Sequence, residues 1–285
     1  MKDKTNETKV LQWHPALYAS IQIELADEAD KLIFENEHQL GTKPKEIDVL
    51  IIKKNSKERI CKNIGRIFRT YNIVEYKSPD DYLSVDDFYK VYGYACFYKA
   101  DAPKEGQINP EEVTISFVSR NYPEKMVKHL REARHLDIME GEKGIYYIDN
   151  DIFQMQLIVT SELQEESNLW LATLTNDLKG RKVIENLIHE YEQHKRENNY
   201  RSVMNVIVNA NMEVFREVKK MCEALEELMK EELDAREKLG LQKGVQALIE
   251  VCNDLELSED DILVKIVEKL NVTENDAKEY IAKYM

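Results

Sequence analysis

The chain has 285 residues, of which 43% are hydrophobic, and its formal net charge is -14 at pH 7. This length and composition predict a globular protein with one large domain, or a core with a smaller appendage. The acidic charge excludes a protein that coats nucleic acid nonspecifically, because phosphate binding depends on clustered lysine and arginine. A local basic patch could still bind a nucleic acid.

Nothing in the sequence indicates a membrane or a secreted location. There is no run of about 18 apolar residues, and residues 1–7 lack the apolar stretch of a secretory signal. The 4 cysteines are scattered without a C-x-x-C pair, which argues against a disulfide framework and a zinc cluster. We therefore expect a cytoplasmic protein with reduced thiols and no membrane partner.

The N-terminal part combines helix and strand signals. Residues 17–31 carry apolar side chains at helical spacing, after a turn-like His14-Pro15. The apolar residues Leu32, Ile33 and Phe34 come next, in a segment that runs on to Leu40. Residues 46–53 contain a short β-branched run, which predicts a strand buried on both faces.

Two further elements follow a basic stretch. Residues 71–77 predict a strand, which the turn at residues 78–80 ends. Ser84 has the character of a helix N-cap, with Asp87 three positions later, and opens a helix that extends to Tyr98. The predicted order is therefore helix, strand, strand, strand, helix.

The α/β pattern continues beyond this point. Residues 113–118, 144–148 and 155–159 predict strands, and residues 126–135 predict a helix between them. We expect the α/β domain to comprise residues 1–178.

Residues 179–285 are charged and helical, with almost no strand signal. Apolar residues between 214 and 229 follow three- and four-residue steps, which predicts an amphipathic helix that packs within the chain or in a coiled coil. A helix over residues 247–255 and two short helices capped by Ser258 and Thr273 follow. We interpret this region as a small helical bundle for assembly or partner contact.

The sequence Glu75-Tyr76-Lys77 carries the strongest chemical signal. Alternation along a strand places Glu75 and Lys77 on one face, and Asp48 on a neighbouring strand could add a second carboxylate. Two hard oxygen donors suit Mg²⁺, which would activate the water that attacks a phosphodiester. Tyr76 could add its backbone carbonyl and Glu24 a further carboxylate. Lys77 would orient or deprotonate the water, or neutralise charge on phosphate.

A basic stretch separates the two strands of this motif. Its cations would place positive potential beside the metal site, although a solvated surface would have the same composition. Lys90, on the following helix, is a further candidate for phosphate contact. The cations of the stretch are Lys53, Lys54, Lys57, Arg59, Lys62, Arg66 and Arg69.

Three stretches carry a resemblance to a known family, namely residues 44–53, 71–79 and 84–90. Together they resemble the PD-(D/E)XK family transposases and recombination-promoting nucleases of bacteria. The resemblance covers residues 13–178 and is strongest over residues 44–98.

The resemblance implies a restriction-endonuclease-like α/β core, with a mixed central sheet flanked by helices, and an all-helical C-terminal region. It also implies a divalent-metal-dependent endonuclease that acts on DNA in mobile elements or recombination, with Mg²⁺ as cofactor and Mn²⁺ as a substitute. Ile47 replaces the proline of the superfamily's name and leaves Asp48 in place. A homodimer with twofold symmetry could cut both strands of a duplex.

Two alternatives stay open. The chain could keep the nuclease fold as a catalytically silent scaffold or binding protein that acts through its helical region, which the acidic charge favours. RNA could also be the substrate, because phosphate and metal chemistry alone does not distinguish the sugar.

Overall fold

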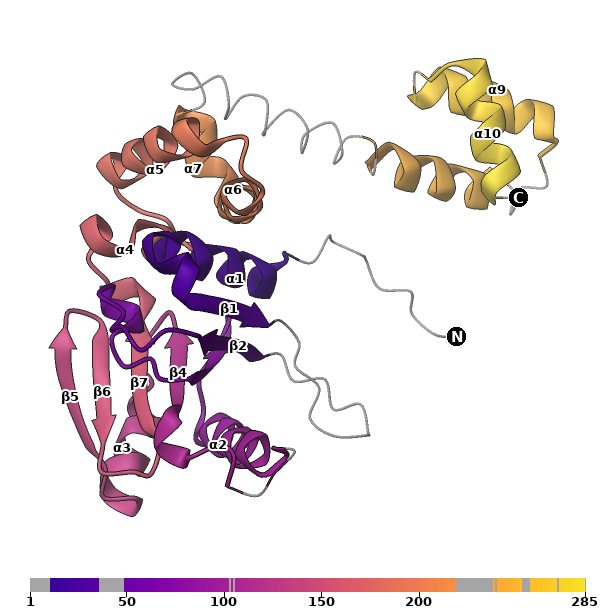
Figure 1. Ribbon diagram of the computed structural model, residues 1–285. Helices are drawn as coiled ribbons and strands as arrows, with labels where there is room; N and C mark the ends of the chain where they lie inside the picture. Colours follow the sequence, from indigo (N-terminus) through magenta and orange to yellow (C-terminus); the bar gives the residue numbers. More distant parts are fainter. Residues whose placement is uncertain are drawn as a thin grey trace. The chain divides into compact units, whose positions relative to one another are not determined.

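The computed structural model describes residues 11–35, 49–102, 104, 106–218, 238, 240–252, 257–270 and 272–284. The chain forms two compact units, Met1–Val218 and Lys219–Met285. The division drawn from the sequence, at residue 178, differs because three further helices belong to the first unit. Of these, α6 packs directly against α1 (Figure 1).

A seven-stranded mixed sheet organises the first unit, with the strand order β1-β2-β3-β4-β7-β6-β5. Strands β3, β4 and β7 are parallel neighbours. The remaining neighbouring pairs are antiparallel. The strands are β1 (Leu32–Glu35), β2 (Val49–Lys54), β3 (Tyr71–Tyr76), β4 (Val113–Ser119), β5 (Asp137–Glu142), β6 (Ile145–Asp149) and β7 (Gln154–Val159). The predicted α/β class with a mixed sheet is confirmed.

Helices cover both faces of this sheet (Figure 1). One face carries α2 (Val85–Ala100) and α3 (Glu124–Ala133), and the other carries α1 (Trp13–Glu24). Beside α1 lies α4 (Glu165–Ala172), and beyond α1 lie α5 (Arg181–His194), α6 (Asn198–Ala210) and α7 (Met212–Val218) (Figure 1). Short 3-10 helices complete the unit, namely η1 (Ala26–Lys31), η2 (Asn63–Gly65), η3 (Pro110–Glu112) and η4 (Thr160–Glu162).

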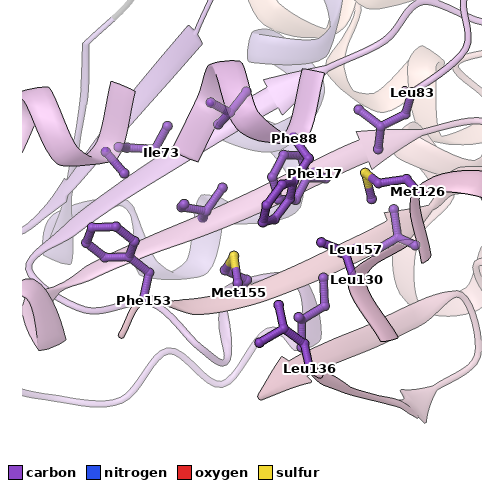
Figure 2. Close-up of a cluster of buried hydrophobic side chains, with 14 of the residues drawn as sticks. Ile73, Leu83, Phe88, Phe117, Met126, Leu130, Leu136, Phe153, Met155 and Leu157 are labelled. Atoms are coloured by element: carbon purple, nitrogen blue, oxygen red, sulfur yellow. The ribbon is translucent and has the colours of Figure 1, made fainter. Parts of the chain in front are cut away.

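The core between the sheet and the helices α2 and α3 is apolar and tightly packed. Phe88 of α2 lies against Phe117 of β4, with 5.7 Å between the ring centroids (Figure 2). Met126 and Leu130 of α3 and Leu157 of β7 belong to the same cluster. This packing fixes α2 over the strands that carry the predicted site.

The first helix begins earlier than predicted. It starts at Trp13, so Pro15 lies in its first turn and does not form a turn before it. Proline is tolerated there because the first N–H groups of a helix have no partner within it. The α-helix also ends at Glu24, and residues 26–31 form the 3-10 helix η1.

Strand β5 was not predicted. It lies at the edge of the sheet and exposes most of its side chains, so its sequence lacks the apolar alternation of a half-buried strand. Glu140 and Glu142 flank a register shift there. Charges and bulges of this kind protect an edge strand from pairing with another chain.

The second unit has its own hydrophobic core. Residues 240–252 are helical, and α9 (Glu259–Leu270) and α10 (Glu274–Tyr284) follow. Ser258 and Thr273 cap α9 and α10 as predicted, since their hydroxyl oxygens accept hydrogen bonds from the backbone N–H groups of Asp261 and Asp276. The core consists of Val245, Ile249, Cys252, Ile262, Ile266, Ala277 and Ile281. The predicted amphipathic helix over residues 214–229 lies mostly outside the described residues.

Within the described ranges, no helix is long and apolar enough to span a bilayer.

Candidate active site

Glu75 lies at the end of β3, on the face of the sheet that α2 and α3 cover. In the register of the sheet its Cα neighbours are Val49 of β2 and Phe117 of β4. Ile73, two residues earlier, belongs to the core beneath α2, and alternation therefore places Glu75 on that face. The residue is only 4% exposed.

Lys77 follows β3 directly, and its backbone N–H donates to the carbonyl of Val118. Its Nζ lies 3.5 Å from Oε1 of Glu75 and 2.8 Å from Oδ1 of Asp87. The predicted pairing of Glu75 with Lys77 on one face is thus present. The ammonium group lies between two carboxylates, and the shorter contact is to Asp87.

Burial and neighbouring charges set the protonation of these groups. Burial raises the pKa of Glu75, although Lys77 and Lys90 act in the opposite direction. Burial alone would lower the pKa of Lys77, but its hydrogen bond to Asp87 and the nearby Glu75 raise it overall. Burial would raise the pKa of Asp87, but hydrogen bonds from Lys77 and Ser84 lower it overall.

Asp87 has a second role at the start of α2, where the predicted N-cap is confirmed. Ser84 and Asp87 form a capping box, in which the Ser84 hydroxyl oxygen accepts from the Asp87 backbone N–H. Oδ2 of Asp87 accepts from the Ser84 backbone N–H at 2.9 Å and from its hydroxyl at 2.6 Å. Sequence reasoning identified the cap but missed the contact with Lys77.

Asp48 and Tyr76 are two further residues of the predicted metal site. Asp48 lies outside the described residues, but it directly precedes Val49, the register neighbour of Glu75. The side chain of Tyr76 lies on the opposite face from Glu75, where its ring contacts His14 of α1. Its hydroxyl is buried without a hydrogen bond in the described structure, and burial raises its pKa.

Glu24 is not brought to Glu75. It lies at the end of α1, on the opposite side of the sheet, and its Oε2 lies 2.6 Å from Nζ of Lys62. Its Oε1 accepts hydrogen bonds from the backbone N–H groups of Trp170 and Leu171, at 2.8 and 3.3 Å.

These contacts explain an irregularity in α4. Asn168 has non-helical backbone angles, which divide the helix into two halves at a kink. Glu24 therefore caps the second half of α4 from another part of the chain. Burial raises the pKa of Glu24, against the lowering effect of Lys62.

Most of the predicted basic stretch is engaged within the fold. Lys53 pairs with Glu35 at 2.5 Å, and Arg66 pairs with Glu142. Lys54 donates to the carbonyls of Ser56 and Glu58.

Hydrogen bonds to backbone carbonyls hold the segment with the basic stretch in place. They come from Arg69, the last cation of the stretch, and from two side chains of neighbouring strands. Arg69 donates to the carbonyls of its own loop. Asn72 of β3 donates to the carbonyls of Ile52 and Arg69, and Gln156 of β7 donates to that of Ile64. The segment is therefore a loop fixed to the sheet, with many of its cations used internally.

The remaining cations are free to meet a ligand. Lys57 and Arg59 are exposed and form no ion pair among the described residues. Lys90 is also exposed, lies over the ring of Tyr94 with 5.6 Å to its centroid, and acts on the pKa of Glu75. Lys90 is thus the predicted DNA contact whose charge acts on the Glu75 carboxylate.

A divalent metal ion fits the Glu75 carboxylate but not Glu24. Glu75 offers a buried carboxylate, whose oxygens are the hard donors that Mg²⁺ and Mn²⁺ prefer. Glu24 does not fit, because both of its oxygens have other partners. Among the described residues, no three His, Cys, Asp or Glu side chains are close enough to bind one ion. A complete metal site would therefore depend on Asp48.

Comparison of the chain with protein-family models, curated proteins and solved structures gave no match.

Proposed function

We propose that this chain is a divalent-metal-dependent nuclease of the PD-(D/E)XK type that hydrolyses phosphodiester bonds in DNA. The observation that carries the proposal is the placement of Glu75 and Lys77, with a 3.5 Å contact, at the end of a buried central strand. The order of elements supports it, because α1, β1, β2, β3 and α2 follow each other as the resemblance implies.

The proposed chemistry divides the work among few groups. Glu75 and Asp48 would hold a divalent ion, with the Tyr76 carbonyl as a further ligand. Such an ion polarises the phosphate and activates the attacking water. The two carboxylates beside Nζ favour the ammonium form of Lys77, so this residue would stabilise negative charge on the phosphate rather than remove a proton. Lys90 would bind a neighbouring phosphate.

The test is cleavage of supercoiled, linear and single-stranded DNA by the purified chain, with Mg²⁺, Mn²⁺ or EDTA. We expect cutting that EDTA abolishes and that Asp48→Ala protein lacks, with a loss of at least about 100-fold. RNA of the same sequence serves as the comparison substrate. Equal cutting by wild type and Asp48→Ala would contradict the proposed site, and preferential cutting of RNA would reassign the substrate.

A second candidate function rests on the C-terminal unit. That unit has its own core and exposes Val251 and Val264, which suits a protein that acts by binding a partner. A folded wild-type chain that cuts no nucleic acid would favour this scaffold function, especially if removing residues 219–285 abolished the biological effect and Glu75→Ala did not.

A further inference from the structure

The two carboxylates beside Lys77 are not equivalent. The ammonium lies 2.8 Å from Asp87 but 3.5 Å from Glu75. Without Asp87, the closest carboxylate to the flexible lysine side chain would be that of Glu75. An ammonium group paired with Glu75 would compete with a metal ion for the same oxygens.

The geometry of Asp87 suits it to hold the lysine in place. Its two oxygens have separate partners, since Oδ1 binds Lys77 and Oδ2 accepts from Ser84. The next residue, Phe88, is fully buried against the sheet, and Val91 one turn later is buried as well. Both the cap and the packing of α2 thus fix the carboxylate relative to β3.

We propose that Asp87 is a positioning residue that holds the Lys77 ammonium away from Glu75, and so leaves the Glu75 carboxylate open to the metal ion. The inference rests on the proposed nuclease function and adds a residue to it. Asp87 contacts neither metal nor substrate in this role, because it acts through Lys77. It also couples the start of α2 to the site.

Asp87→Asn is the informative variant, because asparagine keeps the size of the side chain and an oxygen that can accept from Ser84. We expect kcat to fall about 10- to 100-fold and the half-saturating Mn²⁺ concentration to rise by a similar factor. The KM for DNA should change by less than about twofold. Asp86→Asn is the matched control, since it removes a neighbouring exposed carboxylate from the same helical turn.

A second readout needs neither metal nor activity. Ammonium protons held between two carboxylates exchange slowly with water, so the ¹⁵N-labelled full chain should show a Lys77 ammonium signal in NMR spectra. Lys77→Met assigns the signal by its loss. We expect Asp87→Asn to lose or shift this signal and Asp86→Asn to keep it.

A further variant separates positioning from helix capping. Ser84→Ala removes the capping hydroxyl but leaves the Oδ1 contact of Asp87 available to Lys77. It should lower the urea midpoint while keeping the Lys77 signal. If Asp87→Asn, like Ser84→Ala, only lowers the urea midpoint and keeps the Lys77 signal, Asp87 has a structural role only.

Three results decide the inference. Loss of both the signal and kcat in Asp87→Asn, with Asp86→Asn unchanged, supports it. Active wild type with equally active Asp87→Asn overturns it and leaves the nuclease function intact. Wild type without metal-dependent cleavage of any nucleic acid overturns the proposed function, and with it the positioning role of Asp87 at a metal site, whatever the NMR signal shows.

Discussion

Replacing Glu75 by glutamine is expected to abolish metal-dependent cleavage and to stabilise the fold at neutral pH. The loss of activity should be at least about 100-fold, because the removal of even an outer partner of a metal ligand costs about 10- to 100-fold. The gain in stability follows from burial, since Glu75 is only 4% exposed and its ionised form is poorly solvated.

The pH dependence of that gain has a definite sign. The pKa of Glu75 in the folded chain is raised from its ordinary 4.5, mainly by burial. At pH values between the pKa of Glu75 in the unfolded chain and its raised pKa in the folded chain, the folded state binds more protons than the unfolded state. Stability therefore falls as pH rises through this interval. The destabilisation is fully present above the folded pKa and absent below the unfolded pKa. Each tenfold difference in proton affinity between the two states corresponds to about 1.4 kcal/mol.

Urea unfolding of wild type and Glu75→Gln at a series of pH values checks this expectation. The variant should have the higher free energy of unfolding at about pH 7, and the difference should vanish below about pH 4.5. Glu111→Gln is a control, because Glu111 is exposed on η3. A less stable Glu75→Gln protein would show that its contact with Lys77 outweighs the cost of burial.

Of the substitutions proposed here, Lys62→Met should cause the largest loss of stability, about 3–5 kcal/mol in the free energy of unfolding. Lys62 lies 2.6 Å from Glu24, whose side chain is only 4% exposed. The substitution leaves this carboxylate buried without its counter-charge. Protonation relieves the penalty, so the loss should shrink as pH falls.

A double-mutant cycle tests this assignment against a metal-binding role for Glu24. Glu24→Gln keeps an oxygen that can accept from Trp170 and Leu171. The double variant Glu24→Gln, Lys62→Met should therefore recover most of the stability that Lys62→Met loses. If Glu24 binds metal instead, Glu24→Gln will raise the metal concentration that cleavage requires while stability stays near wild type.

The sequence predicted those parts of the site that depend on local periodicity. Alternation along a strand was enough to place Glu75 and Lys77 on one face, and the Ser84-x-x-Asp87 pattern was enough to predict a cap. The α/β class and the order of its first elements followed from similar short-range patterns. Each of these signals lies within a few residues.

The rest depends on contacts between distant segments. No local pattern indicates that Glu24 meets Lys62 and α4, because these partners are far away in the sequence. The contact of Asp87 with Lys77 requires the turn after β3 to bring α2 back over the strand. The exposed edge strand β5 has no apolar pattern to detect. In each case tertiary packing, rather than local propensity, decides the outcome.

If the chain acts on DNA as proposed, the ion pairs that the basic stretch forms within the fold have a consequence for that encounter. Affinity for DNA depends on salt through counterion release. The logarithm of the binding constant falls with the logarithm of the salt concentration, with a slope of about -0.9 for each neutralised phosphate. With Lys53, Lys62 and Arg66 paired to carboxylates, the exposed cations Lys57, Arg59 and Lys90 would release about three counterions between them. A chain of net charge -14 would thus gain little from long-range attraction, and its choice of DNA would depend on short-range fit at the end of β3.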